Sequence, residues 1–356
     1  MPCKLRSLDG LEFMNKAFLE VLNGKRLNPP PIWLMRQAGR YLPEYRDLRR
    51  KAGGFLKLCY TPDFAVDVTM QPIERFGLDA AILFSDILVV PDGLGQKVSF
   101  VEGTGPVLEP VRNADDVSNL SINNVLDKLA PIYDAVSILS QCLGSKTALI
   151  GFAGAPWTVA CYMIEGRTSR DFHRIKNFCY QDPKLFGELI DLLVDATVAH
   201  LSAQVEAGAE ALQIFESHAG ILPESEFQKW VIKPIKRIVT ALRSRWKNFP
   251  IIGFPRGAGA MYSRFAESTG VSAVSLDTTV SIAWADANLP SGMPIQGNLD
   301  PVYLLKGGGA MDAAIDDILR ACANRPHIFN LGHGVIKETN PDNVLRLTEY
   351  IRNGRD

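Results

Sequence analysis

The chain has 356 residues and carries 38 Lys and Arg against 39 Asp and Glu, a formal net charge of −1 at pH 7. This balance argues against a protein that binds nucleic acids through a basic surface, and against an acidic disordered tail. Apolar residues make up 47%, and the longest apolar runs, such as Ala80–Phe84, fall far short of the roughly 18 residues of a membrane span. We therefore expect neither a nucleic-acid partner nor a membrane partner.

The N-terminus and the cysteines bear on the compartment. Met1–Gly10 contains Lys4 and Arg6 but no apolar stretch, so we expect neither a secretory signal nor a cleaved transit peptide. Six cysteines are scattered along the chain without a CxxC or HxC motif. This spacing argues against a disulfide framework or a cysteine-rich zinc site, and it is typical of the reducing cytosol. We therefore expect a cytoplasmic protein.

Eight short apolar runs predict β-strands. They are continuous rather than alternating, the pattern of parallel strands that helices cover on both faces. The runs are Pro31–Arg36, Ala80–Asp86, Thr147–Phe152, Ala211–Ser217, Pro250–Phe254, Ala273–Asp277, Pro294–Asn298 and His327–Leu331.

Helical patterns lie between these runs. Thr61, Pro62 and Asp63 predict the start of a helix at 61–76, and similar signals predict helices at Asp182–Ala207, Pro223–Arg245, Met311–Asn324 and Pro341–Asn353. The alternation predicts an α/β fold, a single-domain (β/α)8 TIM barrel over residues 1–356. A doubly wound open sheet is the alternative, but it would place a GxGxxG turn after its first strand, and MRQAGRYLPEYR at 35–46 is no such turn.

One segment interrupts the alternation. Pro91–Asn113 is long and rich in Gly and Pro, with KVSFV and PVLEPV on either side of EGTG. We interpret it as a β-hairpin insertion after strand 2, at the C-terminal face of the barrel. Insertions of this kind often form a wall or cover of an active site.

Polar residues follow several of the predicted strands, at the barrel face where catalytic groups are usually found. Any one of them could be a satisfied rim residue, but a rim needs few guanidinium groups, so the set as a whole favours a site. The candidates are Arg36, Gln37, Arg40, Ser85, Asp86, Tyr162, Glu216, Ser217, His218, Asp277 and His333.

Positive charge is concentrated after the first predicted strand. Residues 36–51 hold six bases and two acids. The later bases, from Arg46 onward, could equally form a solvated helix face, whereas Arg36 and Arg40 follow the strand directly and flank Gly39. Guanidinium groups bind carboxylates in pairs of hydrogen bonds, and the glycine lets backbone N–H groups approach a ligand. This predicts a site for a polycarboxylate rather than a phosphate loop, because no GxxxxGK[ST] motif occurs.

Asp86 is the unexpected charge. A carboxylate after an apolar run is costly to bury unpaired, so it is either a partner of an arginine or an acceptor for ligand N–H groups that stabilises a developing cation. His333, Tyr162 and Ser217 could serve the site or simply pack. No spacing of carboxylates and histidines predicts a metal site.

Six motifs together make the sequence recognisable. The motifs are MRQAGRYLPEYR (35–46), FSDI (84–87), GAPWT (154–158), FPRGAG (254–259), GNLDP (297–301) and NLGHGV (330–335). With these motifs, the sequence closely resembles the uroporphyrinogen decarboxylase family along nearly its whole length. The resemblance implies a (β/α)8 barrel without cofactor, acting as a cytosolic homodimer in haem and chlorophyll biosynthesis. The implied reaction converts the four acetates of uroporphyrinogen to methyls and releases four CO2.

The resemblance also implies roles for individual residues. Asp86 matches the aspartate that binds the central pyrrole N–H groups, and Phe215 matches an aromatic residue that packs on the macrocycle. The implied substrate-binding set is Arg36, Gln37, Ala38, Gly39, Arg40, Asp86, Tyr162, Phe215, Ser217 and His333, with Asp86 and Arg36 as catalytic residues. Two positions depart from the expected pattern: His218 stands where we expect Trp, and Arg256 where Lys is commoner.

The chemistry suggested by both arguments needs an electron sink. Protonation of the pyrrole carbon beside an acetate gives a cation that accepts the electrons, so we expect no metal or organic cofactor. Arg36, His333 and a bound water remain candidates for the proton donor. The alternatives are a zinc-dependent methyltransferase on the same barrel, for which no HxC occurs, and a non-catalytic tetrapyrrole carrier.

Overall fold

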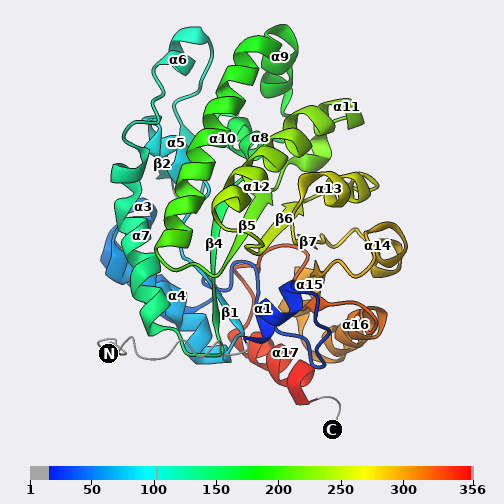
Figure 1. Cartoon of the computed structure of the whole chain (residues 1–356). Coiled ribbons are helices and arrows are strands. Elements are labelled where there is room, and N and C mark those ends of the chain that lie inside the picture. Colours follow the sequence, from blue (N-terminus) through cyan, green and yellow to red (C-terminus); the bar gives the residue numbers. More distant parts are fainter. Residues whose placement is uncertain (1–15, 102, 354–356) are drawn as a thin grey trace.

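A curled parallel sheet of seven strands lies at the centre of the protein (Figure 1). The structure is a computed structural model that describes residues 16–101 and 103–353, so the N-terminal segment 1–10 lies outside the described residues. In spatial order the strands are β1 (Ala80–Ile82), β4 (Ala148–Gly154), β5 (Ala211–Glu216), β6 (Ile251–Pro255), β7 (Ala273–Ser275), β8 (Ile295–Gln296) and β9 (His327–Ile328). Each lies within one of the predicted apolar runs or overlaps it, and all neighbours pair in parallel.

The predicted first strand, Pro31–Arg36, is the exception, because it forms an isolated bridge between Ile32 and Phe329 rather than a strand. Pro31 lacks an N–H donor, and a side chain replaces part of the ladder: Asp79 Oδ2 accepts from the Ile32 N–H at 2.8 Å. Backbone bonds still join both edges of the sheet. The Trp33 N–H donates to Phe329 O at 3.3 Å, and the Asp79 N–H donates to Ile32 O at 2.9 Å.

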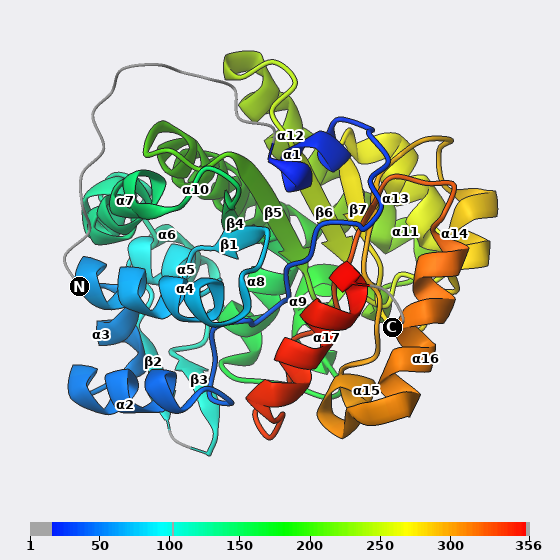
Figure 2. The same ribbon diagram turned by 90° about the horizontal axis from the view of Figure 1, so that it is seen from below.

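Helices surround the strands, as the view from below shows (Figure 2). The longer ones are α2 (Pro43–Ala52), α4 (Pro62–Phe76), α7 (Val125–Cys142), α8 (Pro156–Glu165), α9 (His173–Gln181), α10 (Pro183–Glu206), α12 (Lys233–Arg245), α13 (Met261–Thr269), α16 (Gly308–Ala321) and α17 (Pro341–Asn353). The shorter ones are α1 (Ala17–Leu22), α3 (Phe55–Cys59), α5 (Val89–Gly93), α6 (Ala114–Ser118), η1 (Ala219–Ile221), α11 (Glu224–Phe227), α14 (Ile282–Asn288) and α15 (Pro301–Lys306).

The predicted helices occur, with local corrections. The helix predicted at Pro223–Arg245 contains a π-helical stretch, η2 (Gln228–Ile232), between α11 and α12. At the start of α10, Asp182 Oδ1 accepts from the Leu185 N–H at 3.0 Å, as a capping residue should. Thr61 does not cap α4 in this way, because its hydroxyl instead donates to Lys57 O at 2.8 Å.

A small antiparallel sheet occupies the segment in which we expected a hairpin. It pairs β2 (Val98–Val101) with β3 (Gly105–Leu108). Aromatic rings connect it to the chain that follows β1: Phe100 lies 4.5 Å from Phe55, which lies 5.8 Å from Phe84. The small sheet is thus packed beside the segment that carries Asp86.

One end of the parallel sheet is closed by a tightly packed cluster. Phe18 of α1 and Trp33 are fully buried among the small side chains of the strand starts, including Ala80 and Ala148. The Trp33 indole N–H donates to Gln296 Oε1 at 2.8 Å, which satisfies a polar group inside the sheet. This packing fills the end of the sheet at which the strands begin.

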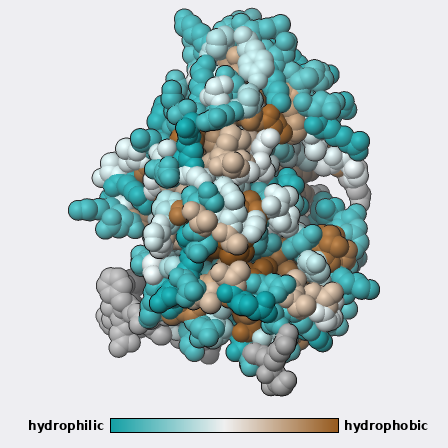
Figure 3. Space-filling view, turned by 90° about the vertical axis from the view of Figure 1, so that its right-hand side faces the viewer, coloured by the Kyte–Doolittle hydropathy of each residue, from teal (hydrophilic) through white to brown (hydrophobic). Residues whose placement is uncertain are grey.

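Four cysteines are free and buried: Cys59, Cys161, Cys179 and Cys322. In residues 16–101 and 103–353, no helix is long and apolar enough to cross a bilayer. The face drawn in Figure 3 is mainly hydrophilic, with apolar side chains in small separate groups.

Candidate active site

The loop after Leu34 is braced by its own side chains. The Gln37 N–H donates to Leu34 O at 2.9 Å, which closes a turn in which Arg36 adopts φ 61°. Non-glycine residues rarely adopt this left-handed conformation, and such strain often marks a functional position. Gln37 itself is buried: its side chain accepts from the Leu34 N–H at 3.1 Å and donates to Ala80 O at 3.1 Å. Its carbonyl also accepts from the Tyr41 hydroxyl at 2.7 Å, so both its side chain and its backbone hold the loop in place.

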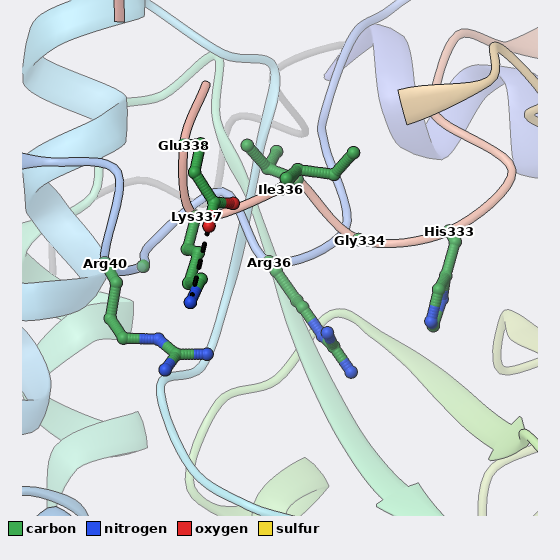
Figure 4. A pocket seen from close by; sticks show the side chains of 9 residues that line it. Arg36, Arg40, His333, Gly334, Ile336, Lys337 and Glu338 are labelled. Carbon is green, nitrogen blue, oxygen red and sulfur yellow. Dashed lines mark ion pairs between the residues drawn. The ribbon is translucent and has the colours of Figure 1, made fainter. Parts of the chain in front are cut away.

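Arg36 and Arg40 extend from this loop into a pocket of about 340 Å³. In Figure 4 the side chains of Arg36, Arg40, Lys337 and His333 extend toward the same region. The pocket is lined by Arg36, Gly39, Arg40, His333, Gly334, Val335, Ile336, Lys337 and Glu338.

Gly334 lets the Arg36 side chain pass close to the backbone. A Cβ added at Gly334 would lie 2.2 Å from Arg36 Cδ and 2.9 Å from its Nε. The guanidinium stays accessible to solvent. Burial lowers the pKa of Arg36, and the negative charge of Asp86 opposes this effect. Arg36 thus connects the pocket electrostatically with Asp86.

Asp86 lies half-buried just beyond β1. Its Oδ1 accepts from the Leu88 N–H at 2.8 Å. Burial raises the pKa of Asp86 from 3.8 to about 6, against the opposing effects of the Leu88 hydrogen bond and the Arg36 charge. Within the described residues, no Lys or Arg nitrogen lies within 4.0 Å of its carboxylate. The interpretation of Asp86 as an ion-pair partner is therefore wrong, although the Leu88 hydrogen bond and the Arg36 charge both favour its charged form.

Aromatic side chains on β5 and α8 form an aromatic wall beside Asp86 and the arginine loop. Phe215 on β5 is half-buried and meets the edges of Phe152 at 5.6 Å and Phe254 at 6.3 Å. Tyr162 is half-buried on α8, and burial, followed by the Asp86 charge, raises the pKa of its hydroxyl. Ser217 follows β5 directly and is also half-buried.

His218 is part of this aromatic wall rather than a charged group. Its ring lies 5.4 Å from Tyr162 and 4.7 Å from Phe172. Its carbonyl accepts from the Trp157 indole N–H at 3.1 Å. Burial and the Arg256 charge lower its pKa to about 4, so the imidazole is neutral at pH 7. A flat aromatic side chain thus still occupies the position where the sequence departs from the expected Trp.

His333 is neutral as well. Burial, together with the charges of Arg36 and Arg256, lowers its pKa to about 3. Its Nδ1 is buried and has no hydrogen-bond partner among the residues that the structure describes. The imidazole can therefore exchange hydrogen bonds with a ligand, but it carries no charge near neutral pH.

Arg256 is a cation of this site that we had noted only as a departure from a pattern. The pairing of Glu216 with Pro255 places Ser217 and Arg256 next to each other, just past the ends of β5 and β6. The Arg256 N–H donates to Glu216 O at 3.0 Å, and the adjacent Gly257 N–H donates to Asp277 Oδ2 at 2.7 Å. Its position directly after an apolar strand is the signal that also identified Arg36.

Comparison with known proteins shows the family. Residues 14–354 match the family model of uroporphyrinogen decarboxylase (URO-D). The uroporphyrinogen decarboxylase of Rhodospirillum rubrum is 52% identical over 337 residues, 95% of this chain and 97% of the relative. That of a Chelativorans species is 51% identical over 340 residues, 96% of this chain and 99% of the relative. The chain belongs to the uroporphyrinogen decarboxylase family.

A solved structure supports the fold independently. A methyltransferase from Methanosarcina mazei superposes with a TM-score of 0.80 over 96% of this chain and 98% of that protein, at 17% identity. At this identity the likeness concerns the fold alone. In the described part of the chain, no three His, Cys, Asp or Glu side chains are grouped as metal ligands would be.

Within this uroporphyrinogen decarboxylase fold, some predicted candidates are structural. Asp277 accepts from the Tyr262 hydroxyl at 3.1 Å and from the Thr279 N–H at 2.9 Å, besides Gly257, and hydrogen bonds lower its pKa despite burial. Glu216 is fully buried, accepts from the Thr158 hydroxyl, and has a pKa raised by burial to about 8. Ser85 keeps a buried hydroxyl without a hydrogen-bond partner among described residues. Asp277 and Glu216 thus position the loops around the pocket.

Two of the remaining bases of the cluster, Arg46 and Arg50, have structural roles. Arg46 donates to Arg40 O at 2.8 Å and to Tyr41 O at 3.2 Å, and these two hydrogen bonds hold the backbone that carries Arg40. Arg50 forms an ion pair with Asp47. Of the bases between 36 and 51, Arg36 and Arg40 line the pocket.

Proposed function

We propose that the chain decarboxylates uroporphyrinogen III, removing CO2 from its four acetate side chains to give coproporphyrinogen III in porphyrin biosynthesis. The chain would thus act as a carboxy-lyase. The observation that carries this proposal is the match at 52% identity over 95% of the chain. The pocket agrees with it, because Arg36 and Arg40 line it and Asp86 interacts electrostatically with Arg36.

Arginines hold the carboxylates of the substrate. Arg36 and Arg40 extend from one loop, and Arg256 presents a third guanidinium from the end of β6. Each charge-assisted hydrogen bond to such a group contributes about 1.5–3 kcal/mol. Backbone N–H groups at Ala38 and Gly39 add neutral donors. The buried Gln37 side chain has no part in this binding.

The other implied substrate-binding residues pack on the tetrapyrrole ring or form hydrogen bonds with its polar substituents. Phe215 is half-buried, and the exposed part of its ring packs on the macrocycle. Tyr162, Ser217 and His333 supply neutral hydrogen-bonding groups. The neutral state of His333, with a pKa of about 3, matters here because a second charge would repel Arg36.

Asp86 stabilises the cation that forms when the pyrrole carbon beside an acetate is protonated. At about 4 Å and an effective dielectric constant of about 20, one carboxylate lowers the energy of such a cation by roughly 4 kcal/mol. This corresponds to about three decades of rate. The carboxylate must be ionised, and with a pKa of about 6 it is ionised at pH 7 by about ten to one.

The proton comes from Arg36 or from a water that Arg36 holds. His333 is a poor donor because its pKa of about 3 leaves no imidazolium at neutral pH. Burial lowers the pKa of Arg36 and so makes its guanidinium a stronger acid than one in water. The C–C bond of the acetate then breaks, CO2 leaves, and the bonding electrons neutralise the cation, which gives an exocyclic methylene. Protonation of this carbon forms the methyl group, and loss of the proton first added to the ring restores the pyrrole, so that each decarboxylation consumes one proton in total.

No metal or organic cofactor takes part, because the protonated pyrrole is itself the electron sink. Dialysis against a chelator should leave turnover unchanged. Loss of turnover that a single metal restores would contradict this. Zinc analysis of the purified protein before dialysis also tests the alternative of a metal-dependent methyltransferase.

Three further proposals concern the whole molecule. The chain forms one (β/α)8 domain over residues 1–356, with segment 31–34 in the place of the eighth strand, which the hydrogen bonds on both of its sides support. Following the family resemblance, it acts in the cytoplasm as a homodimer. Sedimentation at micromolar concentration should show twice the chain mass of 39.2 kDa, and a species of that single mass would refute the dimer.

The experiment that tests the proposed function is CO2 release from chemically reduced uroporphyrinogen III under anaerobic conditions. We expect four CO2 for each substrate and coproporphyrinogen as the product. A protein that binds the tetrapyrrole tightly but releases no CO2 would be a carrier, and the proposed function would be wrong.

A further inference from the structure

Lys337 and Glu338 extend into the pocket beside the arginines, although no motif drew attention to them. Both line the cavity together with Arg36 and Arg40 (Figure 4). Lys337 Nζ lies 3.3 Å from Glu338 Oε1, and the two side chains are 58% and 57% exposed. In the unliganded pocket, the Lys337 ammonium is therefore paired with the carboxylate of the neighbouring Glu338.

The charges of this pocket are unequal. Three permanent cations, Arg36, Arg40 and Lys337, face a single acid, Glu338. An ion pair between exposed side chains is weak, and solvent screens it. An incoming carboxylate that is also held by the arginines can therefore take the place of Glu338 at little cost.

The backbone beneath Lys337 is fixed relative to the arginine loop. The Val335 N–H donates to Met35 O at 2.9 Å, directly beside Arg36, and the Thr339 N–H donates to Ile336 O at 3.0 Å. Only the side chain of Lys337 has freedom to move. A four-carbon stem with a compact charge suits a carboxylate on a flexible arm better than a rigid guanidinium does.

Resting on the proposed function, we propose that Lys337 binds the carboxylate of one side-chain arm of the substrate at the mouth of the pocket, and that Glu338 holds the ammonium until the substrate displaces it. Lys337 is thus a binding residue. An arm held in this way is bound equally well before and during the reaction, so its loss raises KM and leaves kcat nearly unchanged.

The test is a double-mutant cycle of Lys337→Gln and Glu338→Gln, measured as KM and kcat for CO2 release. Lys337→Gln should raise KM about fivefold, the most that an exposed charge pair usually contributes. Glu338→Gln should lower KM about twofold, because the internal competitor is gone. In the double variant the effect of Glu338→Gln should disappear, since it acts only through Lys337.

Arg320→Gln is the matched control. Arg320 pairs with Asp317 on α16 at 2.9 Å, at 73% and 74% exposure and outside the pocket, so its loss should leave KM unchanged. Unchanged KM in Lys337→Gln, an effect on kcat instead, or a raised KM in Glu338→Gln would overturn the proposal.

Fluorescence titration with uroporphyrin separates this proposal from the proposed function. Uroporphyrin carries eight carboxylates on an oxidised ring that does not decarboxylate. If the parent protein releases no CO2, the proposed function fails, and Lys337 is then judged on binding alone. Uroporphyrin should bind about fivefold more weakly to Lys337→Gln than to the parent, and equal binding would refute the role of Lys337.

Discussion

Replacement of Asp86 by Asn should stabilise the fold and abolish most of the activity. Burial raises the pKa of this carboxyl from 3.8 to about 6. A raised pKa means that the folded state binds the proton more tightly than the unfolded state does. The contribution of Asp86 to stability is therefore fully present below about pH 3.8 and is lost as the pH rises through about 6.

The size of the stability change follows from the difference between the pKa values of Asp86 in the folded and unfolded states. At 1.36 kcal/mol for each pKa unit, ionised Asp86 destabilises the unliganded fold by at most about 3 kcal/mol above pH 7. Asn keeps the size of the side chain, and its Oδ1 can still accept from the Leu88 N–H. The advantage of the Asn variant in free energy of unfolding should therefore grow by about 2 kcal/mol between pH 4 and pH 7.5.

Turnover should change in the opposite direction. Without the negative charge opposite the pyrrole cation, single-turnover CO2 release should fall by about two to three decades. In the parent protein, kcat/KM should decline as the pH falls through about 6, and this decline should be absent in the Asn variant. Glu keeps the charge but displaces it by about 1.5 Å, so it should retain more activity than Asn if charge dominates.

Denaturant unfolding at pH 4 and pH 7.5 measures the predicted gain in stability, and single-turnover CO2 release measures the predicted loss of activity. If Asn destabilises the protein at pH 7.5, Asp86 is a stabilising partner and the pKa argument is wrong. If a well-folded Asn variant decarboxylates within a factor of about three of the parent, the proposed role of the charge is refuted.

Three further substitutions test the carboxylate site. Arg36→Ala should weaken binding of the eight-carboxylate substrate more than of intermediates that have lost acetates, and equal losses in KM across the series would contradict the role. Gly334→Ala, whose Cβ would lie 2.2 Å from Arg36 Cδ, should displace Arg36 and lower kcat/KM at least tenfold, or about 1.4 kcal/mol. Gly144→Ala, with nothing within 4 Å, is its control and should retain activity. Arg256→Gln should raise KM and also raise the pKa of His333, which NMR titration measures; an unmoved pKa would place Arg256 away from the site.

The sheet could be predicted from the sequence because apolar runs of parallel strands are a local signal. Seven of the eight predicted runs contain strands. The run at 31–36 fails as a strand because Pro31 lacks a donor and because Asp79 and Gln37 compete for its N–H groups. Both competitors are polar side chains whose positions depend on the folded chain, and no local pattern reveals them.

The site was predictable only as a set of residue types. Gln37 and Arg36 are neighbours in one motif, yet one side chain is buried and the other is accessible. Asp277 and Asp86 both follow apolar strands, but loop N–H and hydroxyl groups satisfy Asp277, whereas Asp86 has the single Leu88 bond and a raised pKa. Whether a polar group is satisfied depends on tertiary contacts, and this is what separates a structural from a functional residue.

The unliganded site stores unfavourable energy that the substrate can relieve. Arg36 has φ 61°, and the charges of Arg36 and Arg256 both lower the pKa of His333, so the positive potential there is not neutralised. Asp86 is held where burial opposes its ionisation. A polycarboxylate neutralises the arginines at the edge of the ring, while pyrrole N–H groups at its centre donate to Asp86 and favour its charged form. A ligand with carboxylates at its edge and N–H donors at its centre therefore neutralises the arginines and also stabilises ionised Asp86. A simple anion would only neutralise the arginines.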